Sequence, residues 1–188
     1  MYKTAESVSP RHPDKMCDQI SDAILDACLE QDPLTRAGIE VMWWHGIVSI
    51  TAELTTDAYV NPRPIVDRIV GEQLGVQTNI VRQSTEIARW VDTGGAGDQG
   101  IMIGYATRET DTYMPLEYEL ARRLNEHIYG LHSHDGKTQV TLLDGRLVTT
   151  VCSWCHVSTS QLDTIISEFV SSDPLFATVA SDEYEKVI

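Results

Sequence analysis

The run His12-Pro13-Asp14-Lys15 combines residue types that bind anions and metals at a predicted helix start. A helix N-terminus favours anions, because its first N–H groups lack partners and its dipole is positive there. His12 and Lys15 add hydrogen-bond donors and positive charge, while Asp14 offers the oxygen ligand that Mg²⁺ prefers. The run predicts a site for a metal-bound polyphosphate. The alternative is an ordinary helix start, where Pro and Asp are common without any ligand.

Two carboxylates, Glu40 and Glu53, are predicted to share one face of a β-hairpin. The strand-like runs 36–44 and 47–55 meet at a two-residue turn, His45-Gly46, which places residue 40 opposite residue 51. Side chains alternate along each strand, so both carboxylates point the same way and could bind a cation or an ammonium group. The alternative is a solvated face, and a register slip of one residue would remove the argument.

A glycine-rich run at 93–100 is the third candidate. It contains no Gly-Lys-Ser/Thr, and it lacks the strand–turn–helix setting of a dinucleotide fingerprint. Glycines permit a mobile gate over a site, although a plain turn is the alternative. The candidate gate residues are Gly94, Gly95, Gly97, Asp98, Gln99 and Gly100.

The run Asp135-Gly136-Lys137 precedes a strand-like stretch, TQVTLL. A lysine at a strand entrance can reach a phosphate, and a surface lysine is the alternative. The histidines just upstream follow no spacing that would place them on one face, so no metal site is predicted there.

Two of the four cysteines, Cys152 and Cys155, belong to a C-x-x-C-H run with the spacing of a c-type haem attachment site. Haem attachment usually requires export, and a zinc site would need a second ligand pair. The run lies in a strand-like stretch, in which these cysteines would point to opposite faces. We interpret both as small strand residues.

The elements that must position these residues form two similar series. Pro13 opens a helix that ends near residues 32–33, the first hairpin follows, and a second helix begins at residues 62–64. An apolar strand is expected at 101–106, after the glycine loop.

The second half repeats this order with a helix at 115–131, a hairpin turning at Asp144-Gly145, and a helix at 159–171. Ser158-x-x-Gln161 predicts a capping box for the last helix. The fold class is therefore α+β: repeated units of antiparallel sheet with helices on one face, and not a doubly wound parallel sheet.

The composition restricts the class of protein. Of 188 residues, 14 are Lys or Arg and 28 are Asp or Glu, which gives a net charge of −14. Nucleic acid and anionic membranes are not expected as partners, because binding phosphates needs a surplus of Lys and Arg. No run approaches the ~20 apolar residues of a membrane helix, and the N-terminal run lacks the apolar core of a secretory signal. We expect a cytoplasmic globular protein.

Together these segments resemble the S-adenosylmethionine synthetases (methionine adenosyltransferases). HPDK and GAGDQG in this order are specific together, and the likeness runs from about residue 4 to residue 160. It implies an N-terminal domain over 1–113 and a middle domain over 114–188. The matching runs are ESVS (6–9), HPDK (12–15), DQISDA (18–23), ELTT (53–56), GAGDQGIMIGYATRETD (95–111), Met114-Pro115 and KTQV (137–140).

The resemblance implies a reaction in which the methionine sulfur attacks C5′ of ATP and expels the triphosphate, which is then hydrolysed to phosphate and diphosphate. Sulfur is already nucleophilic, so the protein must mainly position the reactants and stabilise the leaving group. The implied cofactors are Mg²⁺ and K⁺. The implied roles are catalysis and ATP contact for His12, Lys15 and Lys137, ATP contact for Asp135, Mg²⁺ for Asp14 with Glu6 near its shell, K⁺ for Glu40, methionine ammonium for Glu53, and a gate for the loop 94–100.

Three departures from the family pattern matter. Gly94 stands where the family usually has a methionine-binding glutamine, and Thr51 and Ala52 replace glycines before Glu53. A C-terminal glycine-rich segment of the family, which carries basic phosphate ligands, is absent. A leaving triphosphate bears about four negative charges, which enzymes bind with several Lys and Arg residues plus Mg²⁺.

We therefore expect a subunit of a hetero-oligomeric synthetase that needs a complementary chain carrying the missing region. The alternatives are a non-catalytic regulatory or assembly subunit of a synthetase and, less favoured, a metal-dependent phosphohydrolase acting on triphosphate.

Overall fold

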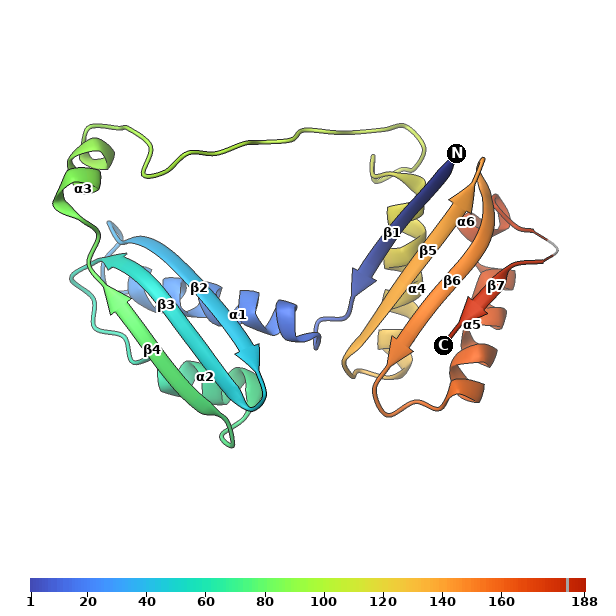
Figure 1. The fold of residues 1–188 in the computed structure, drawn as a ribbon, viewed down its shortest axis with the longest axis horizontal. Coiled ribbons are helices and arrows are strands. Elements are labelled where there is room, and N and C mark those ends of the chain that lie inside the picture. The colour runs from blue at the N-terminus through green and yellow to red at the C-terminus, as the bar shows by residue number, and fades with distance from the viewer. Residues whose placement is uncertain (182) are drawn as a thin grey trace. The chain divides into compact units, whose positions relative to one another are not determined.

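The computed structural model describes residues 1–181 and 183–188 (Figure 1). The described chain forms two compact units. One consists of Pro13–Ile103, and the other combines Met1–His12 with Gly104–Ile188. The first strand thus belongs with the second half of the sequence. The predicted family domains, 1–113 and 114–188, remain a prediction.

The unit Pro13–Ile103 contains a three-stranded sheet in the order β2-β3-β4. Apolar residues spaced for one helix face bury α1 and α2 against this sheet, and its core includes Ile20, Ile24, Val48 and Val66. Its elements are α1 (Pro13–Leu29), β2 (Arg36–Trp44), β3 (Ile47–Thr55), α2 (Pro62–Val70), β4 (Gly75–Val81) and α3 (Thr85–Asp92).

The first hairpin has the predicted turn and register. His45 and Gly46 have φ values of 46° and 78°, as a type I′ turn requires, and Glu40 pairs with Thr51. Strand β4 then joins β3 in parallel, which the sequence analysis did not predict.

The other unit contains a four-stranded sheet in the order β1-β5-β6-β7. Helices α4 and α5 pack on one face, with Leu120, Leu124, Ile128 and Ile166 fully buried. Its elements are β1 (Tyr2–Val8), α4 (Leu116–Leu131), β5 (Gly136–Leu143), β6 (Arg146–Trp154), α5 (Thr159–Ser172), α6 (Pro174–Ala177) and β7 (Glu185–Val187).

Local signals in this unit are confirmed. Asp144 and Gly145 form the second hairpin turn, with φ values of 49° and 81°. Ser158 and Gln161 form both hydrogen bonds of the capping box. The α+β class is correct, and helices cover one face of each sheet (Figure 1). Each sheet nevertheless contains one parallel pair, β3 with β4 and β6 with β7.

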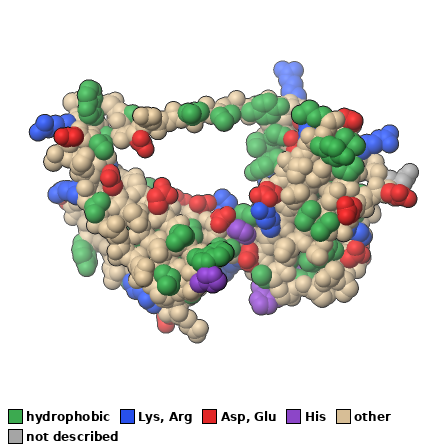
Figure 2. All heavy atoms as spheres, in the orientation of Figure 1, with side chains coloured by type: hydrophobic (Ala, Val, Ile, Leu, Met, Phe, Trp, Pro, Cys, Tyr) green, Lys and Arg blue, Asp and Glu red, His purple; other side chains and the backbone are tan. Residues whose placement is uncertain are grey.

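The predicted strand at 101–106 is wrong. The segment has no regular secondary structure, and Ile101, Met102 and Ile103 are 88–94% exposed. Its apolar side chains stand out along the extended segment in Figure 2. A strand needs a neighbour for its backbone hydrogen bonds, and none of the described strands pairs with this segment.

The strand assignment of Cys155 is also wrong. Strand β6 ends at Trp154, so only Cys152 is a strand residue; it is buried, whereas Cys155 is exposed in the turn that follows. Among the helices that the structure describes, none is long and apolar enough to cross a membrane.

Candidate functional site

A small cavity of about 200 Å³ in the unit that contains β5 brings together three of the predicted nucleotide residues. His12, Asp135 and Lys137 line it, together with two residues that the sequence analysis had not placed in a site, Ser153 and Cys155. Residues 12 and 137 are far apart in the chain, so the cavity brings His12 of the HPDK run together with the DGK run.

Strand pairing explains how the cavity forms. In the register of the sheet, Lys137 lies beside Val8 of β1 on one side and beside Ser153 of β6 on the other. The Cys155 backbone N–H donates to the Asp135 carbonyl at 2.8 Å, which continues the pairing of β5 and β6 beyond Gly136 and Trp154 beside the cavity. Ser153 and Cys155 belong to the C-x-x-C-H run, so this run could have indicated residues of the cavity. Its spacing is instead typical of haem attachment.

Glu6 lies on the same sheet face as Lys137. Its Oε2 is 2.8 Å from the lysine Nζ, and both side chains are about half exposed. An exposed pair of this kind adds little to stability, because solvent screens it. The pair matters for the charge of the cavity, because the Glu6 carboxylate neutralises the lysine that lines it.

Asp14 and Lys15 occupy the first turn of α1, in the other unit, and both are exposed. The Lys15 ammonium donates to Asp18 at 3.0 Å, and Asp14 provides negative charge where the helix dipole favours it. The predicted helix start is confirmed.

A larger cavity, about 720 Å³, lies in the unit Pro13–Ile103. Glu40 and Glu53 both line it, so the predicted sharing of one sheet face is confirmed. Its wall also contains Asp98 of the glycine loop and the apolar side chains of Val81 and Val91. The cavity therefore combines carboxylates with an apolar surface.

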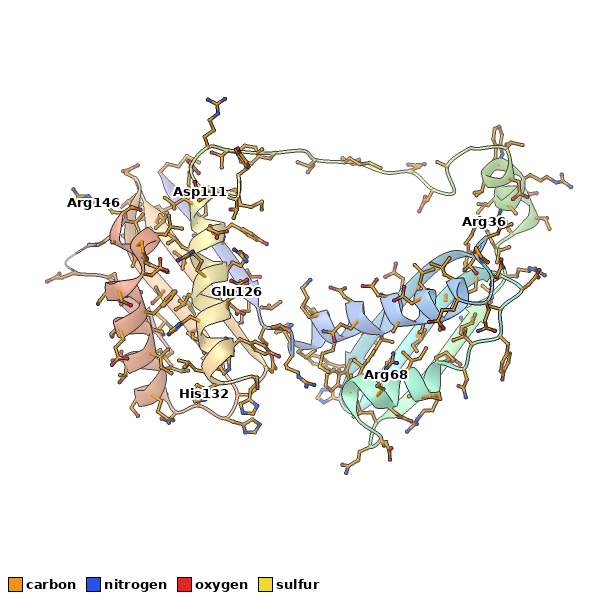
Figure 3. All side chains as sticks on the ribbon, turned by 180° about the vertical axis from the view of Figure 1, so that it is seen from behind. Arg36, Arg68, Asp111, Glu126, His132 and Arg146 are labelled. Atoms are coloured by element: carbon orange, nitrogen blue, oxygen red, sulfur yellow. The ribbon has the colours of Figure 1, made fainter. Side chains whose placement is uncertain are left out.

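Two residues of this cavity, Arg36 and Gln83, were not predicted from the sequence. Arg36 opens β2 and its guanidinium pairs with Asp92 at the end of α3; Figure 3 labels it there. The Arg36 Nε and Gln83 Oε1 atoms are buried, and neither has a hydrogen-bond partner. Gln83 lies in the short loop between β4 and α3, and no periodic pattern marks such a position.

The predicted gate contributes unevenly to this cavity. Gly97 and Asp98 line it, whereas Gly94, Gly95, Gln99 and Gly100 do not. Gly94 has φ 85°, a conformation that side chains rarely adopt. A Cβ on Gly95 would lie 2.7 Å from the Trp90 carbonyl oxygen, so these two glycines are required by the turn that ends α3.

The described residues contain no cluster of three or more His, Cys, Asp or Glu that could hold a metal ion. Mg²⁺ is usually held by one or two carboxylates together with substrate phosphates and water. Asp14 and Glu6 each offer one exposed carboxylate, and they belong to different units. Glu40 offers an oxygen for a monovalent cation in the larger cavity.

The sequence matches two family models: the N-terminal domain of S-adenosylmethionine synthetase over residues 1–92 and its central domain over residues 93–187. Similar proteins include an S-adenosylmethionine synthase from Nocardioides sp., 36% identical, with 98% of this chain and 58% of the relative covered. One from Corynebacterium glutamicum is 42% identical over 73% of this chain and 43% of the relative.

A third, from Thermosynechococcus vestitus, is 37% identical over 98% of this chain and 53% of the relative. The chain thus spans about half the length of the curated relatives that it matches. Both family models together cover nearly every residue, and the chain belongs to the S-adenosylmethionine synthetase family.

Proposed function

We propose that this chain is a subunit of a methionine adenosyltransferase, which makes S-adenosylmethionine from ATP and L-methionine and releases phosphate and diphosphate. The observation that carries the proposal is the cavity formed by His12, Asp135 and Lys137, residues from two separate family motifs. Relatives named S-adenosylmethionine synthase support the same reaction.

In this proposal the nucleotide is bound by His12, Lys15, Asp135 and Lys137. Lys137 and His12 act on the triphosphate, which leaves when the methionine sulfur donates an electron pair to C5′ and the C5′–O bond breaks. The lysine stabilises the growing negative charge on the leaving oxygen. When bound, Mg²⁺ would neutralise phosphate charge, with Asp14 as ligand and Glu6 near its shell.

The larger cavity is assigned to methionine. Glu53 accepts hydrogen bonds from the substrate ammonium, and Glu40 holds K⁺. Gly97 and Asp98 place part of the loop 94–100 at this cavity, which supports a gating role for the loop.

The charge of the nucleotide cavity supports a need for a complementary chain. Its described cationic side chains are Lys137 and, when protonated, His12, and Glu6 already neutralises the lysine. Lys15 is also paired with a carboxylate, Asp18. A triphosphate of about four negative charges requires more basic groups. We therefore propose that a second polypeptide supplies them.

The test is an assay of S-adenosylmethionine formation by the purified 188-residue chain, with and without a chain that carries the part of the relatives' length that this chain does not span. We expect no product from the chain alone and product from the mixture. Full activity of the chain by itself contradicts the need for a partner. In the mixture, Asp14→Asn separates catalysis from regulation: unchanged activity supports a non-catalytic assembly subunit instead.

A further inference from the structure

The larger cavity contains polar and charged side chains besides Glu40 and Glu53 that could bind a ligand. Three carboxylates face one basic side chain, Arg36, and a neutral amide, Gln83, on a wall that also contains valines. A ligand that matches this arrangement carries an ammonium group, a carboxylate and an apolar side chain. An α-amino acid with an apolar side chain has these three parts.

Two polar atoms of this wall lack hydrogen-bond partners. The Gln83 amide oxygen and the Arg36 Nε are buried, and neither has a partner. A buried polar atom without a partner destabilises the protein, so a ligand that pairs with it gains affinity. The amide is positioned at the glycine loop, because a Cβ placed on Gly97 would lie 3.7 Å from the Gln83 Nε2.

The ion pair between Arg36 and Asp92 leaves part of the guanidinium available. One terminal nitrogen, Nη1, donates to Asp92, which joins the start of β2 to the end of α3. A guanidinium has five N–H donors, so Arg36 can bind a ligand carboxylate while it stays anchored. Gly94 has no side chain and so provides no side-chain hydrogen bond.

We infer that Arg36 and Gln83 determine amino-acid specificity in this cavity: Arg36 binds the substrate carboxylate, and the Gln83 amide oxygen accepts from the ammonium beside Glu53. Because that oxygen is buried, the inference requires the terminal amide to rotate when the ligand binds. The inference rests on the proposed function, in which this cavity binds methionine, and adds two residues that determine which amino acid fits.

The test measures L-methionine binding to the 188-residue chain by calorimetry. We expect Gln83→Ala to weaken binding about tenfold, the loss typical of one hydrogen bond to a charged group. Gln73→Ala is the matched control, because Gln73 is an exposed glutamine of the same unit outside the cavity, and it should bind like the wild type.

Methioninamide, which lacks the carboxylate, tests Arg36. Arg36→Gln should weaken methionine binding about tenfold and leave methioninamide binding almost unchanged. Asp92→Asn removes the ion pair but keeps the guanidinium, so it should lose much less affinity for methionine. An equal loss for methionine and methioninamide in Arg36→Gln shows that Arg36 does not bind the carboxylate.

Glu53→Gln distinguishes failure of the inference from failure of the proposed function. If Glu53→Gln abolishes methionine binding while Gln83→Ala binds like the wild type, the role of Gln83 is wrong and the methionine site stands. If both variants bind like the wild type, methionine binds elsewhere. If the wild-type chain binds no methionine either alone or mixed with the complementary chain of the activity assay, this cavity is not an amino-acid site and the inference is overturned.

Discussion

Lys137 Nζ and Glu6 Oε2 lie 2.8 Å apart across the antiparallel strands β5 and β1. The carboxylate holds the lysine beside the small cavity that we propose for the nucleotide, and it competes with any phosphate for the ammonium group. Binding of an anion must therefore replace one ion pair with another. This relationship makes opposite predictions for the two partners.

Glu6→Gln should strengthen binding of metal-free tripolyphosphate several-fold, because a negative charge beside the anion is removed. Lys137→Met should weaken the same binding by about tenfold, since a hydrogen bond to a charged group is lost. Calorimetric titration of the purified chain measures both. Lys186→Met is the control: it removes an equal charge from β7, away from the cavity. Equal effects of the Lys137 and Lys186 substitutions would indicate only a general charge effect.

Gly136 and Trp154 make a second prediction. A Cβ on Gly136 would lie 2.1 Å from the indole Cε3, and Trp154 is almost fully buried, so the ring cannot move aside freely. Gly136→Ala should lower the free energy of unfolding by ~1–3 kcal/mol through overpacking. Denaturant unfolding measures this change.

Gly130→Ala is the control for that substitution. Gly130 lies in α4 with open space around the position of a Cβ, so alanine should stabilise the helix by ~0.5–1 kcal/mol. Equal stability of the Gly136→Ala variant and the wild type would show that the tryptophan can shift.

The first hairpin and its face could be predicted from the sequence because the information is local. Two strand-like runs and His45-Gly46 specify the turn, the turn specifies the register, and the register places Glu40 and Glu53 together. The capping box of α5 is local in the same way.

Non-local pairings could not be predicted in this manner. Strand β1 pairs with β5 more than 100 residues later, and short β7 joins β6 in parallel. No turn signal specifies either pairing. The strand expected at 101–106 failed for a related reason: its apolar composition suits a strand, but backbone pairing requires a neighbour. Arg36 and Gln83 were missed because their role depends on which loops meet at the cavity.

His127 predicts a pH dependence of stability. Burial lowers the pKa of its imidazole, which stacks on Phe169, while Asp173 opposes this shift. The unfolded chain therefore binds more protons than the folded chain below pH ~6.5. The contribution of His127 to the free energy of unfolding should be fully present above that pH and should be lost as the pH falls below it.

His127→Gln should flatten this part of the stability curve, because the titrating group is gone. Denaturant unfolding at several pH values between about 5 and 8 measures the slope. His134→Gln, which removes an exposed imidazole of the same unit, should keep the wild-type slope. If His127→Gln leaves the slope unchanged, another group causes the pH dependence.

Asp173 combines an ion pair with a helix cap. Burial disfavours its charged form, but Arg123 and the N–H groups of Phe176 and Leu175 together lower its pKa. Asp173→Ala loses both interactions and should destabilise by ~2–4 kcal/mol, whereas Asp173→Asn keeps the cap and should lose less. Thermal unfolding compares the stabilities of the two variants.

Glu126→Gln, which breaks an exposed pair with Arg122, is the control and should change stability by less than about 0.5 kcal/mol. Equal losses for Asn and Ala would assign the whole effect to the ion pair.

The cysteines give a chemical test of the nucleotide cavity. Burial raises the pKa of Cys152 to about 11 and leaves its side chain almost inaccessible, whereas Cys155 is exposed and lines the cavity with Lys137. A maleimide should therefore modify Cys155 and spare Cys152, because the thiolate is the reacting species.

Tripolyphosphate should slow modification of Cys155 in the wild type and protect it much less in Lys137→Met, with mass spectrometry of tryptic peptides as the measurement. Cys155→Ser provides the background, since Cys17 is partly accessible. Protection that is equal in the wild type and in Lys137→Met would mean that the anion binds away from this cavity.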